Sequence, residues 1–312
     1  MENILFIGLG KLGLCFALCL ERAGYNVLGV DIDENYINSL NNKSISSQEP
    51  NVEKYLKESK NFKATTDIKS NINFSENIFI MVNTPETDKN YYDPFILDSI
   101  LTKISELSKE TPKHIVISCT VSPNYITNVG YKILNKYHNI HNITYNPEIV
   151  RIGKVIYDIE NNNHPIIIGS NNKEKGIFVE NIYRNIYKYN NINKEFSFCH
   201  MTHENAEITK LATNCFKMMK ITFANMIGDL CDRTHNTDAN IIMKALNKDK
   251  LINYGCFIPG YGYGGPCYPR DCKEFCKVFE NNNISSTILQ SVDKYNDLHA
   301  NYMAEIKSNL DD

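Results

Sequence analysis

One cysteine lies in a stretch whose composition could present its thiol to a ligand. Cys267 follows a segment rich in glycine and proline, and the whole stretch reads Pro259-Gly260-Tyr261-Gly262-Tyr263-Gly264-Gly265-Pro266-Cys267-Tyr268-Pro269-Arg270-Asp271. Glycines let the backbone come close to a ligand and prolines stiffen the chain, so this stretch can mount a thiol nucleophile on a constrained loop. The alternative is a tight structural turn around a buried cysteine, because free cysteines are commonly buried.

A second group of polar side chains lies in a long helical pattern that begins at Thr202, the expected N-cap. Apolar residues recur every three or four positions, and no glycine or proline occurs before Gly228, where we expect an interruption. At about 3.6 residues per turn, Glu207, Lys210 and Asn214 fall on one face of this helix. That face is either the wall of an active site or a solvated surface.

The N-terminal residues predict a strand, a glycine turn and a helix. The apolar run 4–7 is followed by Gly8-Leu9-Gly10-Lys11-Leu12-Gly13 and then by an apolar helical pattern to Leu20. A second strand over 26–30 ends at Asp31, about 20 residues beyond the glycines, where dinucleotide-binding folds place a carboxylate. In this context the glycines would approach the pyrophosphate, and Asp31 would accept a hydrogen bond from the adenosine ribose. The same carboxylate would repel a 2′-phosphate, which favours NAD over NADP.

Further apolar runs predict strands over 77–82, 114–118, 143–145 and 165–169, with a helix over about 175–189. We therefore expect residues 1–198 to form a Rossmann-like, doubly wound parallel sheet of the α/β class. Residues 199–312 should form the long central helix and a smaller all-helical domain, with helices over about 238–246 and 287–310. Thr84 and Thr120 follow two of the strands and should face the cofactor, unless they only cap the following helices.

Composition narrows the class of protein. The 312 residues are 42% hydrophobic and carry a formal net charge of -3, so we expect a globular protein with no nucleic-acid partner. No apolar run is long enough to span a bilayer, and we expect no membrane partner. The ten cysteines lie mostly in apolar surroundings, which is typical of a reduced, cytoplasmic protein. The spacing of Cys267, Cys272 and Cys276 is unlike that of zinc ligands, so no metal site is expected.

Together these motifs resemble the UDP-glucose/GDP-mannose (nucleotide-sugar) 6-dehydrogenase family over almost the entire chain. The resemblance rests on six ordered motifs, namely Gly8 to Asp31, Val82-Asn83-Thr84-Pro85, Cys119-Thr120-Val121, Asn146-Pro147-Glu148, Asn205-Ala206-Glu207 with Lys210-Leu211 and Asn214, and Gly264 to Asp271. It implies a four-electron oxidation of a sugar C6 hydroxyl to a carboxylate, with consumption of two NAD and one water. UDP-glucose is the favoured substrate.

The resemblance also implies roles for individual residues. Cys267 would attack the aldehyde intermediate, while Lys210 and Asn214 stabilise the oxyanion that develops. A water held by Lys210 and Asp271 would take the hydroxyl proton, and Lys210 would favour the Cys267 thiolate. The water that hydrolyses the thioester would be held or activated by Thr120, Glu148 and Asp271. The residues that would bind the cofactor are Gly8, Gly10, Lys11, Leu12, Gly13, Asp31, Thr84, Thr120 and Arg270. Those that would bind the substrate are Glu148, Lys210, Asn214, Tyr261 and Gly264.

Three features depart from the family pattern. Ile152 stands where members commonly carry a second glutamate, and Leu251-Ile252-Asn253 replaces an Arg-Ile-Gly that helps to hold the substrate. Members also continue into a further nucleotide-binding domain, whereas this sequence ends at Asp312. The chain is then a natural short form, a truncated form, or a split form whose C-terminal domain a separate polypeptide supplies. We also expect a homodimer formed through the central helix.

Two other functions are alternatives to nucleotide-sugar oxidation. A two-electron β-hydroxyacid dehydrogenase also combines a Rossmann domain, a helical domain and a lysine at about this chain length, but its chemistry needs no cysteine. The other alternative is a catalytically impaired, truncated NAD-binding homologue that binds cofactor or a partner without turnover.

Overall fold

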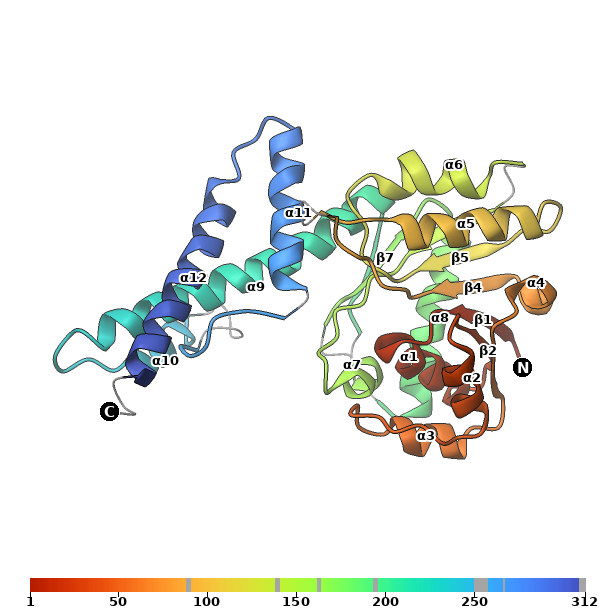
Figure 1. Cartoon of the computed structure of the whole chain (residues 1–312), viewed down its shortest axis with the longest axis horizontal. Coiled ribbons are helices and arrows are strands. Elements are labelled where there is room, and N and C mark those ends of the chain that lie inside the picture. The colour runs from red at the N-terminus through yellow and green to blue at the C-terminus, as the bar shows by residue number, and fades with distance from the viewer. Residues whose placement is uncertain are drawn as a thin grey trace. The chain divides into compact units, whose positions relative to one another are not determined.

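The structure is a computed structural model that describes residues 1–87, 91–137, 141–161, 164–192, 196–249, 258–265 and 267–308. The chain divides into two compact units, which we call unit 1 and unit 2 (Figure 1). Unit 1 comprises Met1–Pro85 and Asp93–Ile208, and unit 2 comprises Glu86–Tyr92 and Thr209–Asp312. No helix in these described ranges is both long enough and apolar enough to cross a membrane.

Unit 1 is built on one sheet, which has eight strands within the described residues, in the order β3-β2-β1-β4-β5-β6-β7-β8. The strands are β1 (Asn3–Ile7), β2 (Asn26–Val30), β3 (Phe62–Thr65), β4 (Asn77–Ile80), β5 (His114–Ile117), β6 (Asn142–Tyr145), β7 (Ile166–Ser170) and β8 (Phe198–Met201). This arrangement confirms the predicted Rossmann-like α/β fold. One detail differs, because β6 and β7 pair antiparallel in an otherwise parallel sheet.

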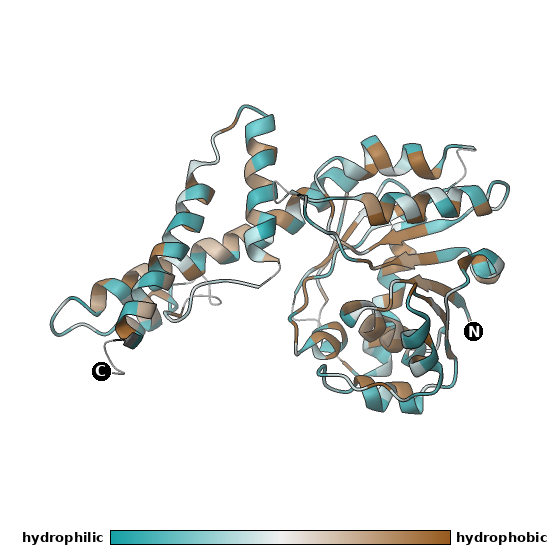
Figure 2. Cartoon of the chain, in the orientation of Figure 1, coloured by the Kyte–Doolittle hydropathy of each residue, from teal (hydrophilic) through white to brown (hydrophobic). Residues whose placement is uncertain are grey.

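Both faces of the sheet are buried, because alternate side chains of each central strand point to opposite sides. In β1, Ile4 and Phe6 enter one hydrophobic cluster and Leu5 and Ile7 enter the other. The first cluster packs with α1 (Lys11–Arg22), α2 (Glu34–Asn41), α3 (Val52–Glu58), α7 (Val155–Asn161) and α8 (Lys173–Tyr189). The second packs with α4 (Ile68–Asn71), α5 (Phe95–Leu107) and α6 (Tyr131–Leu134). The central strands β4 and β5 are accordingly mostly hydrophobic (Figure 2).

The helices of the C-terminal region are α9 (His203–Cys231), α10 (Ala239–Leu246), α11 (Tyr268–Asn281) and α12 (Thr287–Ser308). Thr202 caps α9 as predicted, since its Oγ1 accepts a hydrogen bond from the Asn205 N–H at 3.3 Å. Gly228 does not interrupt α9, which corrects the expectation from the sequence. A Cβ at this position would lie 3.0 Å from the Cβ of Pro259, so close packing of the loop against the helix accounts for the glycine. Leu211, Cys215, Phe275 and Leu289 form the core of unit 2.

The glycine turn between β1 and α1 depends on close backbone contacts. Gly8 has a φ of 93°, and a Cβ there would lie 2.4 Å from the carbonyl oxygen of Met81. A Cβ on Gly13 would lie 1.9 Å from the carbonyl oxygen of Gly8. Around Gly10, by contrast, an added Cβ would meet no described atom within 4 Å. The turn therefore requires glycine at its two ends for packing and leaves space at its middle.

This difference predicts that alanine destabilises the fold at Gly13 but not at Gly10. Gly13→Ala should lower the free energy of unfolding by about 2 kcal/mol or more, because the new methyl group forces α1 away from the turn. Gly10→Ala is the matched control and should change stability by less than about 0.5 kcal/mol. Urea denaturation of both variants measures the difference. Equal midpoints would contradict the packing described here.

Candidate functional site

The candidate site of unit 1 is the dinucleotide turn. α1 begins at Lys11 directly after Gly10, and no side chain among the described residues caps it. An uncapped helix N-terminus directs backbone N–H groups at a ligand and attracts negative charge. The open space at Gly10 lies at this same point. The turn therefore fits the pyrophosphate of a dinucleotide.

Asp31 follows β2 and lies beside this turn. Its Oδ2 accepts a hydrogen bond from the Leu9 N–H at 2.8 Å, so the carboxylate is fixed against the turn while staying partly exposed. Tyr36 holds the turn from the other side, with its hydroxyl donating to the Leu9 carbonyl oxygen at 2.9 Å. The role of Asp31 as an acceptor for ribose hydroxyls remains a prediction.

Thr84 and Thr120 lie just beyond the ends of the neighbouring strands β4 and β5. The Thr84 hydroxyl donates to the Thr120 carbonyl oxygen at 2.7 Å, which ties the two strand ends together. The N-cap of α5 is Pro94, and the helical turn after Thr120 is preceded by Tyr125. The alternative that these threonines cap the following helices is therefore wrong. Their contact with the cofactor remains a prediction.

Glu148 lies in a group of polar side chains with Asn146 and Tyr183. The sequence motif includes Asn146 and Glu148 but not Tyr183. The Tyr183 hydroxyl is 2.5 Å from Glu148 Oε1 and 2.8 Å from Asn146 Oδ1. Burial raises the pKa of Tyr183, so this hydroxyl stays protonated and can donate to the carboxylate. Tyr183 comes from α8 and carries no sequence signal of its own. Ile152, which replaces the second family glutamate, is 64% exposed.

The candidate site of unit 2 is a buried polar cluster around Asp271 on α11. The Asp271 carboxylate is 1% exposed, and it accepts from Asn214 Nδ2 at 2.7 Å and from the Tyr92 hydroxyl at 2.6 Å. Arg270 Nη2 lies 3.4 Å from the same carboxylate. Lys210 and Asn214 are also buried. The predicted alternative of a solvated helix face is therefore wrong.

Tyr92 is a site residue that the sequence did not indicate. It lies far from α11 in the chain, and its backbone N–H donates to Glu274 Oε2 at 3.1 Å. Its ring lies beneath the Arg270 guanidinium, 5.0 Å from the ring centroid. A single tyrosine in a polar segment carries no pattern that would predict these contacts.

Cys267 is exposed, so the alternative of a buried cysteine in a structural turn is wrong. It occupies the N-cap position of α11, and its carbonyl oxygen accepts from the Asp271 N–H at 2.8 Å. The buried cluster and the thiol are thus one helical turn apart.

Tyr261 and Gly264, which were predicted to bind the substrate, lie at open positions of the loop before Cys267. Tyr261 is 87% exposed, and a Cβ on Gly264 would meet no described atom within 4 Å. Leu251-Ile252-Asn253 and Pro266 lie outside the described residues. Within the described ranges, no group of three or more His, Cys, Asp or Glu side chains is arranged to hold a metal ion.

The placement of Asp31 generates a test of cofactor selectivity. Asp31→Asn should weaken NADH binding by about tenfold, because a charge-assisted hydrogen bond to the ribose is lost, and should weaken NADPH binding less. Glu34→Gln removes an exposed charge three residues away and is the control. Fluorescence titration with both nucleotides measures the two affinities. An unchanged ratio between them would remove Asp31 from its assigned role.

Comparison with known proteins agrees with this geometry. The chain is 31% identical to the UDP-glucose 6-dehydrogenase of Rickettsia felis, and the match covers 94% of this chain and 64% of that protein. Its fold is similar to a UDP-glucose dehydrogenase from Pyrobaculum islandicum, with a TM-score of 0.86, 23% identity, and coverage of 96% of this chain and 68% of the other. It is also similar to a GDP-mannose dehydrogenase from Pseudomonas aeruginosa, with a TM-score of 0.74, 26% identity, and coverage of 96% and 69%. The chain thus spans about two thirds of the length of these proteins.

Family models match residues of both units. Residues 2–187 match the NAD binding domain of the UDP-glucose/GDP-mannose dehydrogenase family, and residues 204–298 match its central domain. The first match confirms the prediction of NAD as the cofactor. The chain therefore belongs to the UDP-glucose/GDP-mannose dehydrogenase family.

Proposed function

We propose that this chain catalyses the NAD-dependent oxidation of a nucleotide-sugar C6 alcohol to a carboxylate, through a thiohemiacetal and a thioester on Cys267. The observation that carries the proposal is the exposed thiol at the N-cap of α11, one turn from the buried Asp271 and its Asn214 partner. A two-electron alcohol dehydrogenase has no use for a nucleophile in this position.

The cofactor supplies a hydride acceptor. The residues of unit 1 that would hold it are the turn from Gly8 to Gly13, Asp31, Thr84 and Thr120. In this proposal Arg270 of unit 2 pairs with its phosphates, a role that its guanidinium charge permits.

The first oxidation needs a group that takes the C6 hydroxyl proton. We assign this step to a water held by the Lys210 ammonium and the Asp271 carboxylate. Asn214 and Tyr92 donate hydrogen bonds to this buried carboxylate and hold it in place. The hydride on C6 leaves to NAD in the same step, so the product is an aldehyde.

Cys267 then supplies the covalent step. Its thiolate attacks the aldehyde carbon and forms a C–S bond, while Lys210 and Asn214 stabilise the oxyanion. Loss of a second hydride from the same carbon gives a thioester. Water hydrolyses the thioester, releasing the acid and restoring the thiol, with Thr120, Glu148 and Asp271 orienting or activating that water. Because Ile152 offers no carboxylate, Glu148 and Asp271 are the acids available for this step.

UDP-glucose is the substrate that we propose, since similar proteins from Rickettsia bear the name UDP-glucose 6-dehydrogenase. An assay panel of UDP-glucose, UDP-N-acetylhexosamines and GDP-mannose identifies the sugar. Oxidation of small hydroxyacids without a nucleotide sugar would instead favour the two-electron alternative. NAD binding with no turnover on any of these compounds would favour an impaired homologue.

We also propose that α9 mediates a homodimer. Phe216, Phe223 and Leu230 recur at intervals of seven residues along α9 and are 61%, 45% and 59% exposed. An apolar stripe of this kind is typical of a helix that packs against another helix. Sedimentation equilibrium should give twice the chain mass, and Phe223→Glu should give the monomer. A monomeric wild-type protein would contradict the proposal.

The reaction stoichiometry tests the covalent mechanism. Two NADH should form for each sugar consumed, and Cys267→Ser should lower acid formation by at least about 100-fold because the thioester route is lost. NAD affinity should stay the same in this variant. Cys231→Ser, which alters a half-buried cysteine at the end of α9, is the control. One NADH per sugar, or full acid production by Cys267→Ser, would remove Cys267 from the mechanism.

A further inference from the structure

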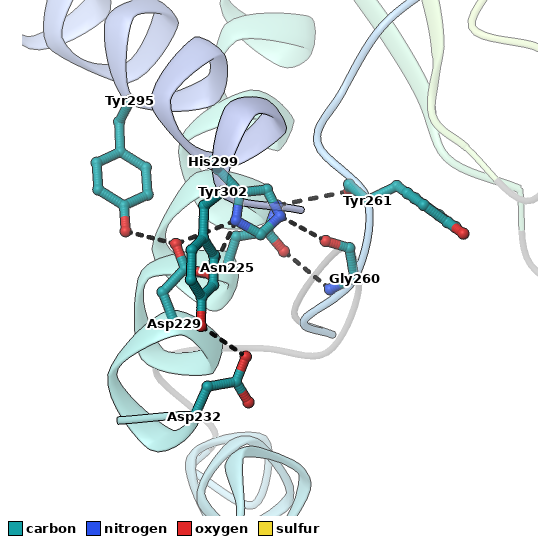
Figure 3. Close-up of polar contacts among 8 residues, drawn as sticks. All are labelled: Asn225, Asp229, Asp232, Gly260, Tyr261, Tyr295, His299 and Tyr302. Carbon is teal, nitrogen blue, oxygen red and sulfur yellow. Dashed lines mark hydrogen bonds and ion pairs between the residues drawn. The ribbon is translucent and has the colours of Figure 1, made fainter. Parts of the chain in front are cut away.

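A second buried polar cluster lies in unit 2, between α9 and α12 (Figure 3). We call residues 260–265 the glycine loop. His299 of α12 points between the carboxylate of Asp229 on α9 and the backbone of Gly260 in this loop. Its Nδ1 is 2.9 Å from Asp229 Oδ1, and its Nε2 is 2.7 Å from the Gly260 carbonyl oxygen. The Tyr295 hydroxyl donates to Asp229 Oδ2 at 2.8 Å. Asp229 and His299 are both buried.

The two ring nitrogens of His299 face two oxygen atoms, one on Asp229 and one on Gly260. The buried Asp229 carboxylate contacts His299 Nδ1 and accepts a hydrogen bond from the Tyr295 hydroxyl, and these contacts replace the water that it loses on burial. Burial raises the pKa of Tyr295 to about 12, so its hydroxyl remains a donor to Asp229.

The same helices hold the glycine loop at further points. Asn225 of α9 accepts from the Gly260 N–H at 3.0 Å, so both polar groups around this glycine are bound by side chains. Asn296 of α12 accepts from the Tyr263 N–H at 2.9 Å and donates to the Tyr263 carbonyl oxygen at 3.1 Å. The Tyr263 hydroxyl donates to Asp293 at 3.0 Å. Side chains thus bind the loop backbone at Gly260 and at Tyr263.

Ordering the backbone of this loop is costly in conformational entropy. Four of its residues from Gly260 to Gly265 are glycines, and glycine loses more backbone entropy on ordering than any other residue. Each ordered residue costs roughly 1–2 kcal/mol, whereas a hydrogen bond contributes only about 1 kcal/mol. Contacts to a charged group, such as those that His299 and Tyr295 make to the Asp229 carboxylate, are the stronger ones. Cys267 follows Gly265 by two residues, so disorder of the loop would reach the thiol.

We propose that His299, paired with Asp229, is a positioning residue that fixes the glycine loop and thereby the Cys267 thiol for reaction. The inference rests on the proposed role of Cys267. His299 does not touch the reacting atoms in this account. It acts through the Gly260 carbonyl group, and Tyr295 supports it by orienting the Asp229 carboxylate.

The test compares two variants of this cluster with two matched controls on the full chain. His299→Gln removes the ring that bridges Asp229 and Gly260, and Tyr295→Phe removes one hydroxyl from Asp229. His235→Gln changes an exposed histidine, and Tyr302→Phe removes a hydroxyl that lies 3.5 Å from Asp232, outside the His299 contacts. The measurements are amide hydrogen exchange of the segment 260–265, kcat and KM with UDP-glucose and NAD, and the urea midpoint.

His299→Gln should speed exchange in the loop by at least about tenfold and lower kcat by about 100-fold, with the KM for NAD unchanged, because a small displacement of a reacting group is costly. Tyr295→Phe should give smaller changes in the same direction, and both controls should match the wild type. If His299→Gln does not fold, Tyr295→Phe provides the same comparison.

Unchanged loop exchange in a folded variant would overturn the proposal, and so would faster exchange with an unchanged kcat. Failure of the proposed function has a different signature, since the wild type itself would then show no nucleotide-sugar oxidation. In that case the positioning role is also lost, while the exchange data still report whether His299 restrains the loop.

Discussion

A carboxylate as deeply buried as that of Asp271 is stable only if donors replace the water that it loses. Unit 2 provides these donors from three separate segments: Asn214 on α9, Tyr92 from residues 86–92, and the neighbouring Arg270. Removing one partner of such a cluster typically costs about 3–5 kcal/mol, so the three segments are strongly coupled. Because α11 begins at Cys267, the same interactions fix the helix end that presents the thiol.

Much of unit 1 could be predicted because its signals are local. The glycine turn, the apolar strands and Asp31 all lie within short stretches whose patterns have few other interpretations. The strand β3 was missed, since Phe62-Lys63-Ala64-Thr65 is a short edge strand with a polar residue in its middle. The antiparallel pairing of β6 and β7 depends on how the chain crosses the sheet, which residue patterns do not encode.

The candidate site was predictable where its residues belong to ordered motifs, as for Asn214 and Asp271. Tyr92, Tyr183 and the pair formed by Asp229 and His299 were not predicted, because each acts through a contact between segments far apart in the chain. Gly228 was misread for the same reason. Its cause is the approach of Pro259, and no feature of the helix sequence itself reveals that contact.

The account depends most on the covalent chemistry of Cys267, and trapping the intermediate tests it directly. The chain is mixed with UDP-glucose and NAD, quenched in acid within the first turnover, digested, and analysed by mass spectrometry. The account predicts a sugar-acyl adduct on the Cys267 peptide that disappears on treatment with hydroxylamine. Formation of the sugar acid with no adduct, or with an adduct on a different residue, would contradict it.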